Sequence, residues 1–405
     1  MTASFWGRAG DGFQASIRAQ EGLVLDEHWI GLPELEHALF ETGVCTDGSA
    51  DLVLVPADWL PRLAESGAVR PLDDLLDDAP IDDWPEAWSP AFTDVVSFAV
   101  PSRGGSSVWG IPFHDGPPLL VWRTDLYEST REREGYRAAT GRDLAPPRTW
   151  EELDAQAAWF TRPDEGLWGT VLAGAPDGHN NVYDFVTRLR VLGADVLDEH
   201  GAPGFGGAAG LAALGRLRAQ VVAGRVPPDA HELDSVGSGA AFAEGRIAVM
   251  VNWAGYAQRA QAPGSAVEGR VGVGIAPARS DGSPLPVVNA FWALAVTTGA
   301  PSLGDAWAVV RELATAEADV RTTLAGSSGT RLDTWRDPRV LAVSGTSALF
   351  EEAHRASRPL PMVPELPELV QVLNRLVDDV VWRGVDASPR LALAVQEAAR
   401  VLSAE

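Results

Sequence analysis

The sequence predicts an α/β protein built from two lobes. The chain has 405 residues, which is more than a single hydrophobic core usually serves. Hydrophobic residues make up 46% and charged residues 22% of the chain, and these proportions are typical of a folded globular protein. Short apolar strands and helices alternate in the first part of the chain, which favours a lobe with a largely parallel sheet.

The first lobe is expected to begin with two strand–helix units. Residues 2–6 and 51–55 are short apolar runs typical of strands. A helix that Pro33 opens follows the first strand, and a helix that Asp58 caps follows the second. The stretch 111–113 is expected to mark a crossing of the chain into the second lobe.

The later elements are predicted from apolar runs, capping signals and glycine stops. Thr149 and Glu152 form a capping box that opens a helix. Ser388 followed by Pro389 is expected to open the last helix. The remaining predicted strands are 119–122, 247–251, 271–275 and 293–296, and the remaining predicted helices lie around 211–221, 307–313 and 369–380.

The charge of the chain argues against several classes of partner. The formal net charge is -24 at pH 7, and every position counted as lysine or arginine is an arginine. Such a surface repels a phosphate backbone and an anionic membrane leaflet, so no nucleic-acid partner is expected. The single cysteine, Cys45, excludes an internal disulfide and a cysteine-based zinc cluster. No metal or cofactor is expected.

The N-terminus leaves two possibilities for localisation. Met1 and Thr2 lead directly into the first strand, without a basic leader, an apolar segment or a cleavage site. Either an export signal is missing from this sequence, or the protein stays in the cytoplasm. No apolar run approaches the length of a membrane span.

Five stretches, in their order along the chain, resemble the family 1 extracellular solute-binding proteins, the group that includes the maltose-binding proteins. These stretches are 51–67 leading into Pro71-Leu72, 110–113 with 120–126, 147–153, 241–253, and 329–331 with Asp337-Pro338. Their order over nearly the whole chain carries the resemblance. Two positions depart from the family pattern: Trp122-Arg123 replaces a tyrosine-asparagine pair, and Asn289-Ala290 replaces a glycine pair.

The resemblance implies a two-lobed, periplasmic-binding-protein-like clam-shell, in which discontinuous α/β lobes are joined by a hinge. Lobe 1 would hold residues 1–110 and 258–300, and lobe 2 residues 111–257 and 301–405. A protein of this kind is not an enzyme. It would bind a carbohydrate, mono- or oligosaccharide, in the cleft and pass it to the permease subunits of an ABC importer. The expected form is a monomer outside the cytoplasm, as a cell-surface lipoprotein or in the periplasm.

The aromatic composition suits a sugar ligand. The chain has 15 tryptophans but only 4 tyrosines. Sugars present apolar C–H faces ringed by hydroxyl groups, so flat indole surfaces combined with amides and carboxylates match their chemistry. Three of the tryptophans, Trp150, Trp307 and Trp382, are expected on the apolar faces of helices and are assigned to the core.

By resemblance, the ligand-binding residues follow the strands that end at the cleft. They are Trp6, Arg8, Asp58, Trp59, His114, Asp115, His179, Asn180, Asn181, Tyr183, Asn252, Trp253, Tyr256, Asn289, Phe291, Trp292, Arg331 and Trp335. Trp253 is the leading candidate. Structural roles are open for several others: a helix cap for Asp58, packing between helices for Trp59, and a salt bridge for Arg331. For His114 and His179 a structural role is favoured over ligand binding.

Three rival functions stay open. The first is an enzyme with paired carboxylates, although the sequence contains neither a His-Glu-x-x-His motif nor a Gly-x-Ser-x-Gly elbow. The second is a binding protein of the same fold for a peptide, a polyamine or phosphate. The third is a cytoplasmic sensor that uses the same fold.

Overall fold

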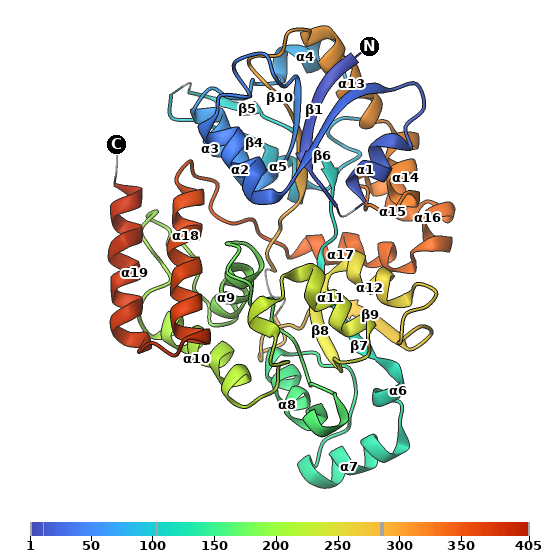
Figure 1. The fold of residues 1–405 in the computed structure, drawn as a ribbon, viewed down its shortest axis with the longest axis vertical. Helices are drawn as coiled ribbons and strands as arrows, with labels where there is room; N and C mark the ends of the chain where they lie inside the picture. Colours follow the sequence, from blue (N-terminus) through green and yellow to red (C-terminus); the bar gives the residue numbers. More distant parts are fainter. Residues whose placement is uncertain (1, 11, 103, 284–286, 404–405) are drawn as a thin grey trace. The chain divides into compact units, whose positions relative to one another are not determined.

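The computed structural model describes residues 2–10, 12–102, 104–283 and 287–403 (Figure 1). The chain divides into two compact units, each assembled from separate stretches, as the sequence predicts. Unit 1 comprises Met1–Gly116, Asn289–Arg355 and Pro359–Leu366. Unit 2 comprises Pro117–Val288, Ala356–Arg358 and Pro367–Glu405.

These boundaries differ from the expected ones in two stretches. Residues 258–288 were expected in the first lobe but belong to unit 2, because the strand β9 (Val271–Ile275) pairs with β7 (Pro118–Arg123). Residues 301–355 were expected in the second lobe but belong to unit 1, because the helix α13 (Leu303–Leu313) packs against two strands of the unit 1 sheet.

Within the described residues, unit 1 contains a five-stranded sheet of order β2-β1-β3-β10-β6. β1 (Thr2–Arg8) runs parallel to β2 (Val24–Ile30) and β3 (Leu52–Pro56). β10 (Trp292–Val296) is antiparallel to both β3 and β6 (Ile111–His114). The expected parallel arrangement therefore holds only for the N-terminal strands, because β10 enters the sheet from a distant part of the chain.

Helices cover the unit 1 sheet, and β4 (Ser97–Ala99) and β5 (Ser106–Val108) pair antiparallel as a separate two-stranded sheet. The turn η1 (Ala57–Trp59) contains Asp58, and Trp59 is the N-cap residue of the next helix. The predicted cap role of Asp58 is therefore wrong. Besides α13, the helices are α1 (Phe13–Arg18), α2 (Leu32–Glu41), α3 (Leu60–Glu65), α4 (Asp73–Asp78), α5 (Pro90–Val96), α14 (Ala316–Leu324), α15 (Leu332–Arg336), α16 (Pro338–Val343) and α17 (Phe350–Arg355).

Unit 2 contains a three-stranded antiparallel sheet of order β8-β7-β9 in the part of the chain that is described, with β8 spanning Val249–Trp253. Both faces of this sheet are covered, which explains why its strands are apolar runs. One face packs against α8 (Trp150–Phe160), and the other packs against α11 (Ser235–Ala243) and α12 (Ala254–Gln261) (Figure 1).

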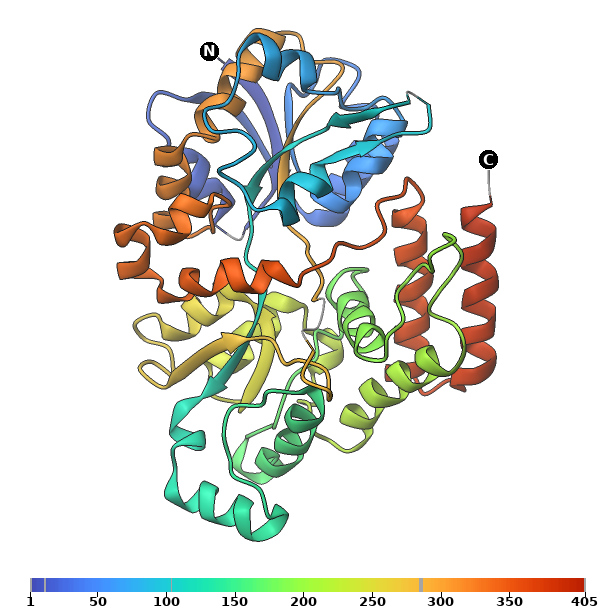
Figure 2. The same cartoon turned by 180° about the vertical axis from the view of Figure 1, so that it is seen from behind.

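The remaining helices of unit 2 surround this layered core. α18 and α19 lie side by side in both views (Figures 1 and 2). A π-helical turn, η5 (Asp378–Trp382), follows α18 directly. The helices are α6 (Thr124–Tyr127), α7 (Thr130–Thr140), α9 (Asn180–Val191), α10 (Gly207–Val222), α18 (Leu366–Val377) and α19 (Ala387–Leu402).

Two glycines of β9 make room for a tryptophan on the neighbouring strand. Gly272 pairs directly with Trp122 of β7, and a Cβ atom at Gly272 would lie 2.2 Å from the indole. A Cβ atom at Gly274 would lie 3.3 Å from the same ring. Trp122 therefore packs over β9 only because Gly272 has no side chain.

Replacing Gly272 with alanine is expected to displace the Trp122 indole from its rotamer and to lower the free energy of unfolding by about 1–3 kcal/mol. Gly274→Ala is the matched control on the same strand, because its Cβ requires only a small shift of the ring. The measurement is the urea unfolding midpoint of both variants. Equal midpoints for the two variants would contradict this account of the β7–β9 pairing.

Candidate functional site

A pocket of about 50 Å³ lies within unit 2, where β8 ends. Its walls come from β7, β8, α8, α9, α11 and the stretches around 171–173 and 287–288. It is lined by Pro118, Trp150, Val171, Ala173, Asn180, Tyr183, Asp184, Thr187, Ser238, Val251, Asn252, Trp253, Val287 and Val288. Aromatic, aliphatic, amide, hydroxyl and carboxyl groups therefore meet in one small space, as in a typical small-molecule site.

Trp253, the last residue of β8, is fixed by three neighbours. Its backbone N–H donates to Asn252 Oδ1 at 2.8 Å, and its indole N–H donates to Asn180 Oδ1 at 2.9 Å. The ring of Tyr183 meets the indole edge-on, with ring centroids 5.9 Å apart. The half-buried indole is therefore held in one orientation before any ligand arrives, which reduces the entropy lost on binding.

One face of α9 lines the pocket. Asn180, Tyr183, Asp184 and Thr187 are spaced three and four residues apart, so they lie on the same side of the helix. The opposite side of α9 is apolar and fully buried through Val182, Phe185, Val186 and Leu189. The amphipathic pattern of the helix thus determines which polar side chains enter the pocket.

Asp184 is the only acidic residue that lines this pocket within the described part of the chain. Burial raises the pKa of its carboxyl to about 7, although the charge of Arg188 and a hydrogen bond from the Ala173 backbone favour the charged form. The guanidinium of Arg188 is itself paired with Asp154 at 2.9 Å. It also stacks over the Trp150 ring, 4.2 Å from the centroid. Because Asp154 compensates most of its charge, Arg188 stabilises the charged form of the Asp184 carboxyl only weakly.

The structure brings four of the predicted ligand residues into this pocket: Asn180, Tyr183, Asn252 and Trp253. The other predicted residues of unit 2 lie elsewhere. Asn181 is buried and its amide donates to the Asn374 side chain. The ring of Tyr256 packs against Gly239, and His179 precedes α9 with its Nδ1 3.4 Å from the Tyr183 hydroxyl.

Sequence reasoning missed Trp150, Asp184, Thr187 and Ser238 in the pocket wall. Trp150 was assigned to the core, and it is indeed 6% exposed, but it also lines the pocket. The helical spacing from Asn180 and Tyr183 would have identified Asp184 and Thr187 if the stretch had been assigned to a helix instead of a loop. The sequence contains no comparable pattern for Ser238.

In unit 1, two predicted residues meet on neighbouring strands. Trp292 of β10 pairs in register with His114 of β6, and the ring of Phe13 contacts both, with centroids 5.0 and 4.7 Å away. His114 Nδ1 accepts a hydrogen bond from the backbone N–H of Ser328 at 3.0 Å. Both predicted side chains are half-buried, so this group keeps an accessible aromatic and imidazole surface.

The other predicted residues of unit 1 are engaged within that unit. Trp6 stacks on His28 and donates to a backbone carbonyl, and Arg8 lies half-buried at the end of β1. Asp115 bonds His354 at 2.6 Å, and both side chains are 1% exposed. The remaining members are all buried: Asp58, Trp59, Asn289, Phe291 and Trp335.

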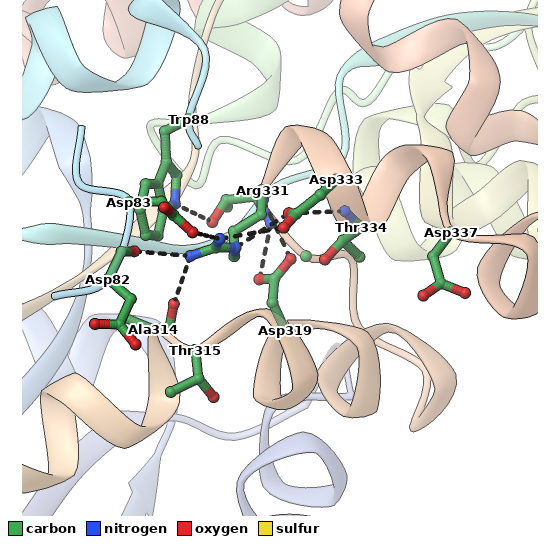
Figure 3. A network of polar contacts seen from close by, with 12 residues as sticks. Asp82, Asp83, Trp88, Ala314, Thr315, Asp319, Arg331, Asp333, Thr334 and Asp337 are labelled. Carbon is green, nitrogen blue, oxygen red and sulfur yellow. Dashed lines mark hydrogen bonds and ion pairs between the residues drawn. The ribbon is translucent and has the colours of Figure 1, made fainter. Parts of the chain in front are cut away.

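Arg331 is bonded on every side (Figure 3). Its Nε and Nη2 donate to the two carboxylate oxygens of Asp333 at 3.1 Å each. Its Nη1 donates to the backbone carbonyls of Ala314 and Asp82, and its guanidinium lies 4.7 Å from the centroid of the Trp88 ring. The side chain is 2% exposed, so all three nitrogens bond within unit 1. This arrangement favours a structural salt bridge over ligand binding for Arg331.

Comparison with known proteins identifies the family. The family described as bacterial extracellular solute-binding protein matches residues 40–320, more than half of the chain. The chain belongs to this family.

Individual relatives are distant. A solute-binding protein of an ABC transporter from Agrobacterium radiobacter K84, solved with ribitol, is 22% identical, with a TM-score of 0.86 and coverage of 99% of this chain and 98% of that one. Maltose-bound MalE3 of T. maritima is 20% identical, with a TM-score of 0.82 and 98% coverage of both chains. The mannitol-binding protein of Pseudomonas aeruginosa is 26% identical over 149 residues, which are 37% of this chain and 28% of that protein.

The fold of this solute-binding protein is thus the two-lobed α/β fold that its structural relatives share, as the sequence predicts. Among the described residues, no group of three or more His, Cys, Asp or Glu side chains is placed to hold a metal ion. No helix in the described part of the chain is long and apolar enough to cross a membrane.

The raised pKa of Asp184 makes the stability of the solute-binding protein depend on pH. In the unfolded chain the carboxyl titrates near 3.8 and in the folded chain near 7, so the folded state binds the proton more tightly. The stabilisation is complete below about pH 4 and is lost as the pH rises to about 7. Asp184→Asn, which stays neutral, is therefore expected to exceed the wild type by ~2 kcal/mol at pH 8, with allowance for partial exposure of the side chain.

Urea unfolding at pH 5 and pH 8 measures this difference. Asp281→Asn is the control, because hydrogen bonds from Ser283 hold the pKa of that exposed carboxyl below its ordinary value, and its charge does not change over this range. A stability gain for Asp184→Asn that is the same at both pH values would show that Asp184 titrates normally.

Proposed function

We propose that this solute-binding protein binds a neutral carbohydrate, either a sugar or a sugar alcohol, with the pocket of unit 2 as part of its binding surface. It would act outside the cytoplasm as a monomer and present the ligand to the permease subunits of an ABC importer. The observation that carries the proposal is the fixed indole of Trp253, held by Asn180 and Asn252 beside a cluster of hydroxyl and carboxyl groups.

The chemistry of the pocket supports this ligand class. An indole face packs on the C–H surface of a polyhydroxylated carbon chain or ring, while amide, hydroxyl and carboxyl groups exchange hydrogen bonds with its hydroxyls. The proteins to which this chain is similar include one named for mannitol and structures solved with ribitol and maltose. All three ligands are neutral and rich in hydroxyl groups.

A thermal-shift screen tests the proposal, with ribitol, mannitol and maltose among the sugars and sugar alcohols offered. A ligand present at about 100 times its Kd is expected to stabilise the folded state by about 2.7 kcal/mol. Peptides, polyamines and phosphate form the opposing arms of the screen. A shift with one of these ligands and none with any carbohydrate would refute the proposal.

Calorimetric titration with the best ligand then tests the pocket. Trp253→Ala is expected to weaken binding by about 2 kcal/mol, or roughly 30-fold in Kd, because a preorganised aromatic contact is lost. Trp168→Ala is the matched control: this half-buried tryptophan of unit 2 lies outside the pocket beneath Arg246. Equal effects of the two substitutions on Kd would place the binding surface elsewhere.

A further inference from the structure

Two residues that line the unit 2 pocket each have a buried polar atom without a hydrogen-bond partner among the described residues: Trp150 Nε1 and Ser238 Oγ. Both residues line the pocket, and both are almost fully buried, at 6% and 2% exposure. Buried donors are nearly always paired in native proteins, because an unpaired group loses its bonds to water on folding. Two such atoms on residues that line one pocket point to a polar ligand that supplies the missing hydrogen bonds.

The unpaired indole lies at the fixed start of a helix and beneath a guanidinium group. Trp150 begins α8, whose N-terminus is fixed by the capping box: Thr149 Oγ1 accepts from the Glu152 N–H, and the Glu152 carboxylate accepts from the Arg148 N–H. Arg188 covers the ring at 4.2 Å. The lack of a partner is therefore a property of the folded pocket.

Other buried or half-buried indoles of the chain show the contrast. Trp159, Trp307 and Trp335 donate their N–H groups to Glu132 Oε2, to the Ala79 carbonyl and to the Gly329 carbonyl, at 2.8–2.9 Å. Packing elsewhere in the protein thus supplies an acceptor to the indole. In the pocket, Trp150 has none.

The hydroxyl of Ser238 also lacks the bond that its place in α11 would allow. A serine inside a helix can donate to the carbonyl four residues earlier, and here that carbonyl belongs to Asp234, which already accepts the Ser238 backbone N–H. Ser238 Oγ makes no such bond in the described structure. Because a hydroxyl can donate and accept, Ser238 complements the donor-only indole N–H.

The charges around the pocket select against anions. Asp184 contributes a carboxyl to the wall, and Arg188 is compensated by Asp154, which its Nη1 and Nη2 contact at 3.3 and 2.9 Å. No uncompensated cation therefore lines the pocket within the described residues. The volume of about 50 Å³ corresponds to only a few water-sized groups, so it suits one end of a ligand.

We propose that Trp150 Nε1 and Ser238 Oγ each bind a hydroxyl group of the ligand, and that the pocket accepts neutral polyhydroxy compounds while it rejects their acidic counterparts. The inference rests on the proposed carbohydrate binding and adds its contact atoms and its charge selectivity. The indole N–H donates to one ligand hydroxyl, and Ser238 Oγ exchanges a hydrogen bond with a ligand hydroxyl in the pocket that Asp184 also lines.

Trp150→Phe and Ser238→Ala separate this role from packing, because each removes one unpaired atom and keeps most of the side chain. Without ligand, Ser238→Ala is expected to melt at the same temperature as the wild type or higher, since a buried group without a partner has been removed. Trp150→Phe also leaves a small cavity beneath Arg188 and is expected to melt at a lower temperature. With the best neutral ligand of the screen, each is expected to raise Kd roughly tenfold by calorimetry.

Trp159→Phe is the matched control, because its indole N–H bonds Glu132 outside the pocket. It is expected to lower the melting temperature and to leave Kd unchanged. Titration with gluconate beside mannitol tests the charge selectivity, and the acid is expected to bind at least tenfold more weakly than the neutral polyol.

The outcomes distinguish this inference from the proposed function. If the wild type binds no carbohydrate, the proposed function fails and the inference fails with it. If the wild type binds but Trp150→Phe and Ser238→Ala keep its Kd, the pocket holds only water and this inference alone is overturned. Tighter binding of gluconate than of mannitol would overturn the charge selectivity.

Discussion

The pocket of unit 2 depends on two of the hydrogen bonds that Asn252 makes at the end of β8. Its Oδ1 accepts from the Trp253 backbone, and its Nδ2 donates to the Ser235 carbonyl at the start of α11. Successive side chains of β8 face opposite layers, so Val251 packs against the α8 side and Met250 against the α11–α12 side. A slip of one residue against β7 would exchange these faces. The direction of the Trp253 indole therefore follows from strand register and amide bonding together.

The electrostatic character of the pocket is set locally and not by the net charge of the chain. Surface charges are screened within about 8 Å at physiological ionic strength, whereas Arg188, Asp154 and Trp150 are in direct contact. This arrangement neutralises a buried cation and leaves burial to govern Asp184, whose pKa rises to about 7. A nearly neutral pocket in a protein with a formal charge of -24 is consistent with a ligand that carries no charge.

The sequence predicted the two-unit α/β architecture and the strand ends of the pocket, because apolar runs and capping signals are local. It placed Asn252 and Trp253 at the end of a strand for that reason, and both line the pocket. It failed where the outcome depends on distant contacts: β10 joins the unit 1 sheet antiparallel, and the stretch around β9 belongs to unit 2. The helical phase of α9 determines that Asp184 faces the pocket while Asn181 turns to Asn374. Buried aromatic residues such as Trp335 have the same local pattern whether they pack or bind.

Some buried polar side-chain atoms of the described residues have no hydrogen-bond partner. Arg331, enclosed in unit 1, has all three nitrogens bonded. Trp150 and Ser238 are equally buried but unpaired, and both lie in the one pocket that also contains Asp184 with its raised pKa. Unpaired buried polar atoms of this kind are expected at functional sites, where a bound ligand can supply the missing hydrogen bonds. If a ligand supplies the missing partners as proposed, stability without ligand and affinity for ligand oppose each other in this pocket.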